Sequence, residues 1–370
     1  MSEPFNWFEL FEKERESMIP PNVLVVGKTG VGKSTLINAM FNGNIADTGV
    51  GEPVSKHLQK YTREGVPIAI WDTRGLELSS AAQHAVFQEI RSEIRDLIET
   101  GDPVKQLHVC WYCVNDFGNR IEQAEIDWIR ELSEQLPVVL VLTQTYSKKK
   151  LDFYQKIKEM QLPVKQIVRV LALGMQFDEG LEAQSHGLSE LSEITFQLLP
   201  EQLQKAFVAA QKVNVEQKAK TAWKVAKLTI GGSAAAAALP PGSDLAAIGV
   251  LQATMLARIT NVFGLEYGSK FFMAVVGGVA GRLGIGALAA FALGKIAKFT
   301  GIGYVAGVAI DATVTVAVST ALAAAYINVC KKALLGRLEG MSEDQIAKMV
   351  HEEFERKRND GTDASPDDKV

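Results

Sequence analysis

The run Gly27-Lys28-Thr29-Gly30-Val31-Gly32-Lys33-Ser34 decides the fold, because it completes the phosphate-loop pattern G-x-x-x-x-G-K-[ST]. The apolar run 23–26 before it predicts a buried strand, and the run 35–40 after it predicts a helix. A glycine loop between a strand and a helix N-terminus aims backbone N–H groups at one point, which suits a polyphosphate. We expect Lys33 to reach the β and γ phosphates and the Ser34 hydroxyl to bind Mg²⁺.

A second phosphate-binding element follows at Asp72-Thr73-Arg74-Gly75, directly after the predicted strand 68–71. In P-loop proteins a carboxylate here holds Mg²⁺, usually through water, and the glycine N–H contacts the γ-phosphate. Between the two motifs, the segment 49–55 predicts a loop that supplies a hydroxyl to the Mg²⁺ shell. Ser55 is the first choice and Thr48 the substitute, and a polar connection without a ligand role is the alternative.

Apolar strands alternate with amphipathic helices through the first half of the chain. The predicted strands are 23–26, 68–71, 107–114, 138–142 and 167–171. This alternation predicts an α/β fold of the P-loop NTPase type, with a mainly parallel, doubly wound sheet. Ligands are then expected at the carboxyl ends of the strands.

The composition excludes several classes of protein. The net charge is −4, so the chain as a whole has no basic field for DNA or RNA, and no RNA-binding module is recognisable. Three cysteines are too few for a disulfide framework, and no cleavable signal peptide opens the chain, which predicts an intracellular protein. Cys110 and Cys113 would face opposite sides of the sheet, which favours buried apolar roles over a metal site.

The chain divides by composition into four parts. These are a short amphipathic helix in 1–21, the P-loop domain in 22–198, an all-α apolar domain in 199–345, and a charged, disordered tail in 346–370.

The apolar half permits two interpretations. Between residues 221 and 340 there are ten cationic and four anionic side chains among long Ala- and Gly-rich runs, which suits contact with anionic lipid headgroups. The alternative is a soluble helical bundle with a core of alanine and glycine faces. The sequence does not separate these two interpretations.

The motifs GKTGVGKST and DTRG, with the run from His108 to Arg120, resemble the TRAFAC-class P-loop GTPases of the Era-like and septin-like branch. Within this branch, which includes the interferon-inducible and chloroplast-import types, they are similar to bacterial GTPases of the ribosome-binding type. The C-terminal half is similar to the helical domain of YcjF-like bacterial proteins, at 239–244, 252–255 and 299–303. The resemblance implies binding of GTP and GDP, and association with a membrane.

The chain departs from these GTPases at two positions. The expected base-reading motif is Thr143-Gln144-Thr145-Tyr146, in which Tyr146 stands where a carboxylate would select guanine. Leu76 stands where many small GTPases place the glutamine that orients the attacking water, so intrinsic hydrolysis is expected to be slow. The water is then positioned by backbone groups, by another residue or by a second protomer. The third of these alternatives implies a homodimer. Arg74 is a candidate to approach the phosphates, with a solvated loop arginine as the alternative.

These considerations predict one nucleotide site. Its nucleotide-binding residues are Gly27, Lys28, Thr29, Gly30, Val31, Gly32, Lys33, Ser34, Thr35, Asp72, Gly75, Thr143 and Gln144; its Mg²⁺ ligands are Ser34, Ser55 and Asp72; and its catalytic residues are Lys33, Arg74 and Gly75.

The favoured function is a slow GTPase switch coupled to a membrane-associated helical domain, in the cytoplasm or at the cytoplasmic face of the inner membrane. One alternative is a nucleotide sensor or membrane effector that does not hydrolyse. The other is an assembly GTPase that acts on the ribosome or RNA.

Overall fold

The structure is a computed structural model of the 370-residue chain. It describes residues 7–43, 45–48, 50–53, 58–73, 83–102, 104–147, 151–177, 182–236, 244–265, 312–338 and 340–359. Two compact units divide the chain. The sheet unit is Met18–Asn214, and the helical unit combines Met1–Ser17 with Val215–Val370.

A seven-stranded sheet forms the centre of the sheet unit, in the order β2-β3-β4-β1-β5-β6-β7. Its strands are β1 (Asn22–Val26), β2 (Val50–Pro53), β3 (Leu58–Arg63), β4 (Val66–Thr73), β5 (Val109–Asn115), β6 (Val138–Thr143) and β7 (Gln166–Arg169). The run of neighbours from β4 to β7 is parallel, while β3 and β2 are antiparallel additions at one edge. The predicted α/β class with a mainly parallel sheet is therefore confirmed.

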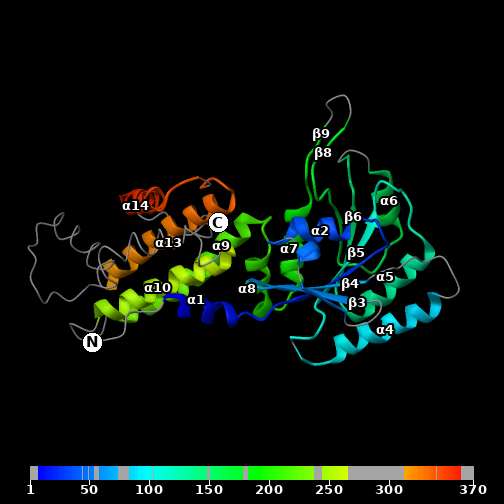
Figure 1. Cartoon of the computed structure of the whole chain (residues 1–370), viewed down its shortest axis with the longest axis horizontal. Helices are drawn as coiled ribbons and strands as arrows, with labels where there is room; N and C mark the ends of the chain where they lie inside the picture. Colours follow the sequence, from blue (N-terminus) through cyan, green and yellow to red (C-terminus); the bar gives the residue numbers. More distant parts are fainter. Residues whose placement is uncertain are drawn as a thin grey trace, which may run out of the picture. The chain divides into compact units, whose positions relative to one another are not determined.

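Helices cover both faces of this sheet (Figure 1). One face carries α2 (Lys33–Met40), α7 (Leu188–Leu198) and α8 (Glu201–Ala210), and the other carries α4 (Gln83–Glu99), α5 (Gln123–Gln135) and α6 (Asp152–Glu159). The short helix α3 (Ile45–Thr48) follows α2, and a separate hairpin pairs β8 (Met175–Gln176) with β9 (Glu182–Ala183).

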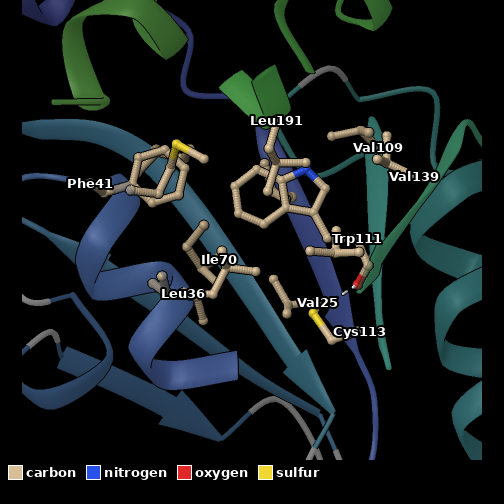
Figure 2. Close-up of a cluster of buried hydrophobic side chains, with 14 of the residues drawn as sticks. Val25, Leu36, Phe41, Ile70, Val109, Trp111, Cys113, Val139 and Leu191 are labelled. Carbon is tan, nitrogen blue, oxygen red and sulfur yellow. Dashed lines mark hydrogen bonds between the residues drawn. The ribbon is translucent and has the colours of Figure 1, made fainter. Parts of the chain in front are cut away.

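Side chains along each strand point alternately to the two faces of the sheet, so a hydrophobic core forms on each face. Trp111 and Cys113 of β5 point into the α2 side, where Phe41 stacks on the Trp111 ring at a centroid distance of 5.8 Å (Figure 2). Cys110 and Tyr112 point into the opposite core. All three cysteines are buried free thiols, and burial raises the pKa of Cys113 to about 12. The prediction that Cys110 and Cys113 face opposite sides of the sheet is confirmed.

The structure differs from the sequence analysis in two places within the sheet unit. Part of the expected loop 49–55 is strand β2, which pairs with β3, a strand that the sequence analysis did not predict. The predicted domain boundary at 198/199 also differs from the compact unit, which extends to Asn214. The reason is that α8 places Phe207 and Ala210 in the core beside the sheet.

The helical unit contains α1 (Trp7–Glu16), α9 (Val215–Ala236), α10 (Asp244–Phe263), α13 (Ala312–Leu334) and α14 (Glu343–Asn359). Helix α9 packs on α10 and α13, and α1 packs on α10 through the buried Phe11, whose carbonyl accepts a hydrogen bond from Asn261. Between α10 and α13, the hydroxyls of Thr260 and Tyr326 lie 2.7 Å apart. Residues 201–236 form two helices, α8 and α9, which belong to different units.

The expectation of a disordered tail from residue 346 is wrong up to Asn359, because α14 occupies this segment. Ile346, Val350 and Phe354 recur every four residues and are buried, and α14 packs on α13. Residues 360–370 lie outside the described part of the chain. Among the described helices, none has both the length and the apolar character needed to cross a lipid bilayer.

Candidate functional site

The predicted phosphate loop connects β1 to α2 at the carboxyl edge of the sheet. Gly27, Gly30 and Gly32 have φ angles of 149°, 80° and 96°, which L side chains rarely adopt. Gly32 is the N-cap of α2, and no side chain caps this helix, so the first-turn N–H groups face the loop without a side-chain acceptor. Ser34 and Thr35 lie exposed in that first turn. This arrangement can receive a phosphate on backbone N–H groups.

Lys33 and Asp72 come together beside this loop. The Lys33 ammonium donates hydrogen bonds to the carbonyls of Gly27 at 2.8 Å and Lys28 at 3.2 Å, and its Nζ lies 4.0 Å from Asp72 Oδ1. Both side chains are nearly buried, with exposed fractions of 11% and 12%. Asp72 arrives through the parallel pairing of β4 with β1, in which it lies opposite Val25. The structure thus places the two residues that were predicted from separate motifs at one point.

The donor set suits Mg²⁺. A hydroxyl from Ser34 and a carboxylate from Asp72 are oxygen ligands, and Mg²⁺ is typically held by one or two carboxylates together with substrate phosphates. In the described residues, no cluster of three or more His, Cys, Asp or Glu side chains forms a metal site. The predicted residues Ser55, Arg74 and Gly75, together with Leu76, lie outside the described residues, so their roles stay predictions.

An ion-pair group ties the phosphate loop to helix α5. The ammonium of Lys28 lies 2.9 Å from a carboxylate oxygen of Glu122 and 3.1 Å from one of Glu125. Partial burial alone would lower the pKa of Lys28, but its hydrogen bonds to the two carboxylates raise the pKa overall. Glu122 and Glu125 also form a reciprocal capping box at the start of α5. Lys28 therefore holds the loop against a well-capped helix.

The predicted residues Thr143 and Gln144 contact the loop from the end of β6. Thr143 Oγ1 lies 2.6 Å from the Val31 carbonyl oxygen, and Gln144 Nε2 donates to the Gly30 carbonyl at 3.0 Å. Gln144 has a φ of 54°, and its Oε1 accepts a hydrogen bond from Asn115 Nδ2 at 3.2 Å. The loops after β1, β5 and β6 are thereby cross-linked through one glutamine side chain.

Several residues of this edge were missed by the sequence analysis. Asp116 forms an ion pair with Arg169 of β7 at 3.2 Å, and rings of Phe117 and Phe177 flank Tyr146. The polar residues at the carboxyl end of β5 were a signal for Asn115 and Asp116. No sequence signal pointed to Phe177, because its hairpin reaches Tyr146 only through the tertiary fold.

Comparison with known proteins adds independent findings. Residues 22–144 match the family model described as "50S ribosome-binding GTPase". Neuronal-specific septin-3 of Danio rerio is 21% identical over 164 residues, which cover 37% of this chain and 45% of that protein. Translocase of chloroplast 108 of Physcomitrium patens is 32% identical over 97 residues, which cover 26% of this chain and 10% of that protein.

Among solved structures, a crystal structure of Cdc11 from Saccharomyces cerevisiae is similar with a TM-score of 0.27 and 21% identity, covering 40% of this chain and 65% of that chain. The chain spans less than half the length of the curated relatives named above. The family match and these relatives support a P-loop GTPase domain in residues 22–144. These relatives are eukaryotic, so a bacterial source stays a prediction, as does the YcjF-like character of the C-terminal half.

Proposed function

We propose that the sheet unit binds GTP with Mg²⁺ and hydrolyses it slowly to GDP and phosphate, as a nucleotide-dependent switch. The observation that carries this proposal is the meeting of Lys33 and Asp72, 4.0 Å apart, beside an uncapped helix N-terminus. Phosphoryl transfer in P-loop proteins requires a lysine, a carboxylate and backbone N–H groups close to one another. The family match of residues 22–144 agrees with this chemistry.

Each group has a distinct role in this proposal. The N–H groups of the loop and of the first turn of α2 hold the phosphates, and the Lys33 ammonium turns from the loop carbonyls toward the β and γ oxygens. Ser34 and Asp72 hold Mg²⁺, which neutralises charge on the β and γ phosphates when it is bound. Lys28 keeps the loop in place through Glu122 and Glu125. Because Leu76 cannot orient water, turnover is slow.

The experiment combines calorimetry with single-turnover hydrolysis on the full chain. Lys33→Ala should abolish Mg²⁺-dependent binding of GTP, and Asp72→Asn should weaken binding only when Mg²⁺ is present. Lys105→Ala is the matched control, because the Lys105 side chain is 69% exposed and pairs only with Asp102 among the ion pairs described. A wild-type chain that binds neither GTP nor ATP would contradict the proposal. Binding without any turnover would favour a nucleotide sensor.

We also propose that the helical unit transmits the switch to a membrane surface. The surplus of cations between residues 221 and 340 supports this, although Arg258, Lys331 and Lys332 form ion pairs with Glu14, Glu216 and Glu353. These three pairs neutralise part of the surplus inside the unit. Binding to vesicles with and without anionic lipid tests the proposal. Equal binding to both vesicle types, or none, would contradict it.

A further inference from the structure

Three aromatic rings from separate segments gather at the edge of the sheet that carries the phosphate loop. Tyr146 contacts Phe117 at a centroid distance of 5.6 Å and Phe177 at 5.7 Å, both edge to face. The outer rings are open to solvent, with exposed fractions of 73% for Phe117 and 42% for Phe177. Large exposed apolar groups that cluster, rather than scatter, mark a binding surface.

The cluster is linked to the phosphate loop by hydrogen bonds. Gln144 donates to the Gly30 carbonyl, and Tyr146 follows Gln144 by two residues. Asn115 donates to Gln144, and Phe117 follows Asn115 by two residues. The loops that carry Phe117 and Tyr146 therefore begin at Asn115 and Gln144, which are hydrogen-bonded to each other. Gln144 also connects both loops to the phosphate loop.

The half-buried Arg169 connects the two loops. Arg169 donates to Asp116 Oδ2 at 3.2 Å and to the Ser147 carbonyl at 2.8 Å, and these residues are the chain neighbours of Phe117 and Tyr146. The exposed fractions of the Arg169 and Asp116 side chains are 12% and 11%. The Asp116 N–H also donates to the Thr143 carbonyl at 2.9 Å. The rings are thus held in place before any ligand arrives, which favours tight binding.

We propose that Phe117, Tyr146 and Phe177 form a stacking platform for the purine base of the nucleotide. Tyr146 stands where a guanine-selecting carboxylate is expected, and the carboxylate of Asp116 is engaged by Arg169. Stacking on an aromatic face tolerates any base, since every base has a π face. The site is therefore expected to bind GTP and ATP with similar affinities. The platform rests on the proposed nucleotide binding and explains how the purine base of the nucleotide is held.

The test measures binding of GTP, ATP and inorganic tripolyphosphate to the full chain by calorimetry with Mg²⁺. Tyr146→Ala and Phe117→Ala should each weaken both nucleotides by roughly 5- to 150-fold, the range for loss of one base–aromatic stack. Tripolyphosphate has no base, so its affinity should not change. Tyr146→Phe keeps the ring and should bind like the wild type. Val104→Ala, at an exposed valine elsewhere in the same unit, is the control.

Arg169 is a positioning residue in this proposal. Arg169→Met should weaken nucleotide binding in the same direction as Tyr146→Ala while leaving tripolyphosphate affinity unchanged. A purely structural role would lower both affinities together. Because Phe117 is largely exposed, Phe117→Ala should keep the wild-type melting temperature, and this variant decides the question if the others unfold.

The outcomes separate this inference from the proposed function. Unchanged nucleotide affinity in Tyr146→Ala and Phe117→Ala would contradict the platform proposal without contradicting the proposed nucleotide binding. Equal losses for nucleotides and tripolyphosphate also overturn it, since the variants then act through the phosphate loop. A wild-type preference for GTP above 100-fold that persists in Tyr146→Ala overturns it as well. A wild type that binds neither nucleotides nor tripolyphosphate overturns the proposed function and the platform together.

Discussion

Gly27 meets two requirements that no other residue type satisfies. Its φ is 149°, and a Cβ at this position would lie 2.5 Å from the carbonyl oxygen of Cys113. Cys113 lies in β5, beside β1 in the parallel sheet, so the chain leaves β1 by passing close to a neighbouring backbone. The shape of the phosphate loop therefore depends on the absence of a side chain at its first residue.

Gly27→Ala should destabilise the sheet unit by about 1–3 kcal/mol, the usual cost of a strained backbone position, and should weaken nucleotide binding. Thermal unfolding and calorimetry measure the two effects. Gly118→Ala is the matched control, because its Cβ would meet its nearest atom at an ordinary 3.5 Å. Equal stability of the two variants would show that the loop relaxes without cost.

Lys28 illustrates a residue whose role depends on its partners. The P-loop pattern leaves this position free, yet the lysine joins the loop to α5 through Glu122 and the buried Glu125. The carboxyl pKa of Glu122 is lowered by its hydrogen bonds to Lys28 and Arg120. Lys28 pairs with both carboxylates and Arg120 pairs with Glu122, all at the N-terminus of α5, where a carboxylate is also favoured by the helix dipole.

At the scale of elements, α14 shows how composition can mislead. The segment is rich in charges, which indicates disorder, but its few apolar residues share one face and pack on α13. Lys332 of α13 also pairs with Glu353 of α14 at 2.9 Å. A narrow apolar stripe, together with the Lys332–Glu353 ion pair, therefore contributes to docking a helix that composition alone would leave unfolded.

Phe354→Ala should lower the free energy of unfolding of the helical unit by about 3 kcal/mol, because it removes a buried aromatic side chain. It should also release α14 from α13. Amide hydrogen exchange of residues 343–359 measures this release. Lys348→Ala, at a side chain that is 76% exposed, should leave exchange unchanged. Protection that survives in Phe354→Ala would mean that the other contacts of α14 hold it.

For the whole molecule, the division into two units follows core contacts and not the order of the chain. The N-terminal helix α1 belongs to the helical unit, since Glu14 pairs with Arg258 of α10. Helix α8 belongs to the sheet unit, because the segment after it pairs back onto α2: Lys212 donates its N–H to the Met40 carbonyl at 2.9 Å. A change in composition near residue 200 marks neither boundary.

The fragment 18–214 should therefore fold alone and unfold in one cooperative transition, whereas the fragment 18–198 should melt at a lower temperature or aggregate. The shorter fragment lacks Phe207 and Ala210, which leaves part of the apolar core uncovered. Circular dichroism during heating compares the two. Identical melting temperatures would contradict the assignment of α8 to the sheet unit.

The amino-acid sequence was sufficient to predict what depends on neighbouring residues. The glycine loop, the strands around it and the α/β class follow from local pattern, because backbone freedom and the alternation of apolar residues are properties of short segments. The resemblance to GTPases also predicted, from motif spacing, that Tyr146 stands where those proteins carry a base-reading carboxylate.

Only the tertiary structure decided which distant segments meet. Gln144 hydrogen-bonds Gly30, and Arg169 connects the loops of Phe117 and Tyr146. Phe177, which contacts Tyr146, lies beside a hairpin strand sixty residues after Phe117. Sheet order brings these groups together, and sheet order is set by the packing of helices on both faces of the strands. A base platform built from three separate segments can therefore be recognised only after the chain has folded.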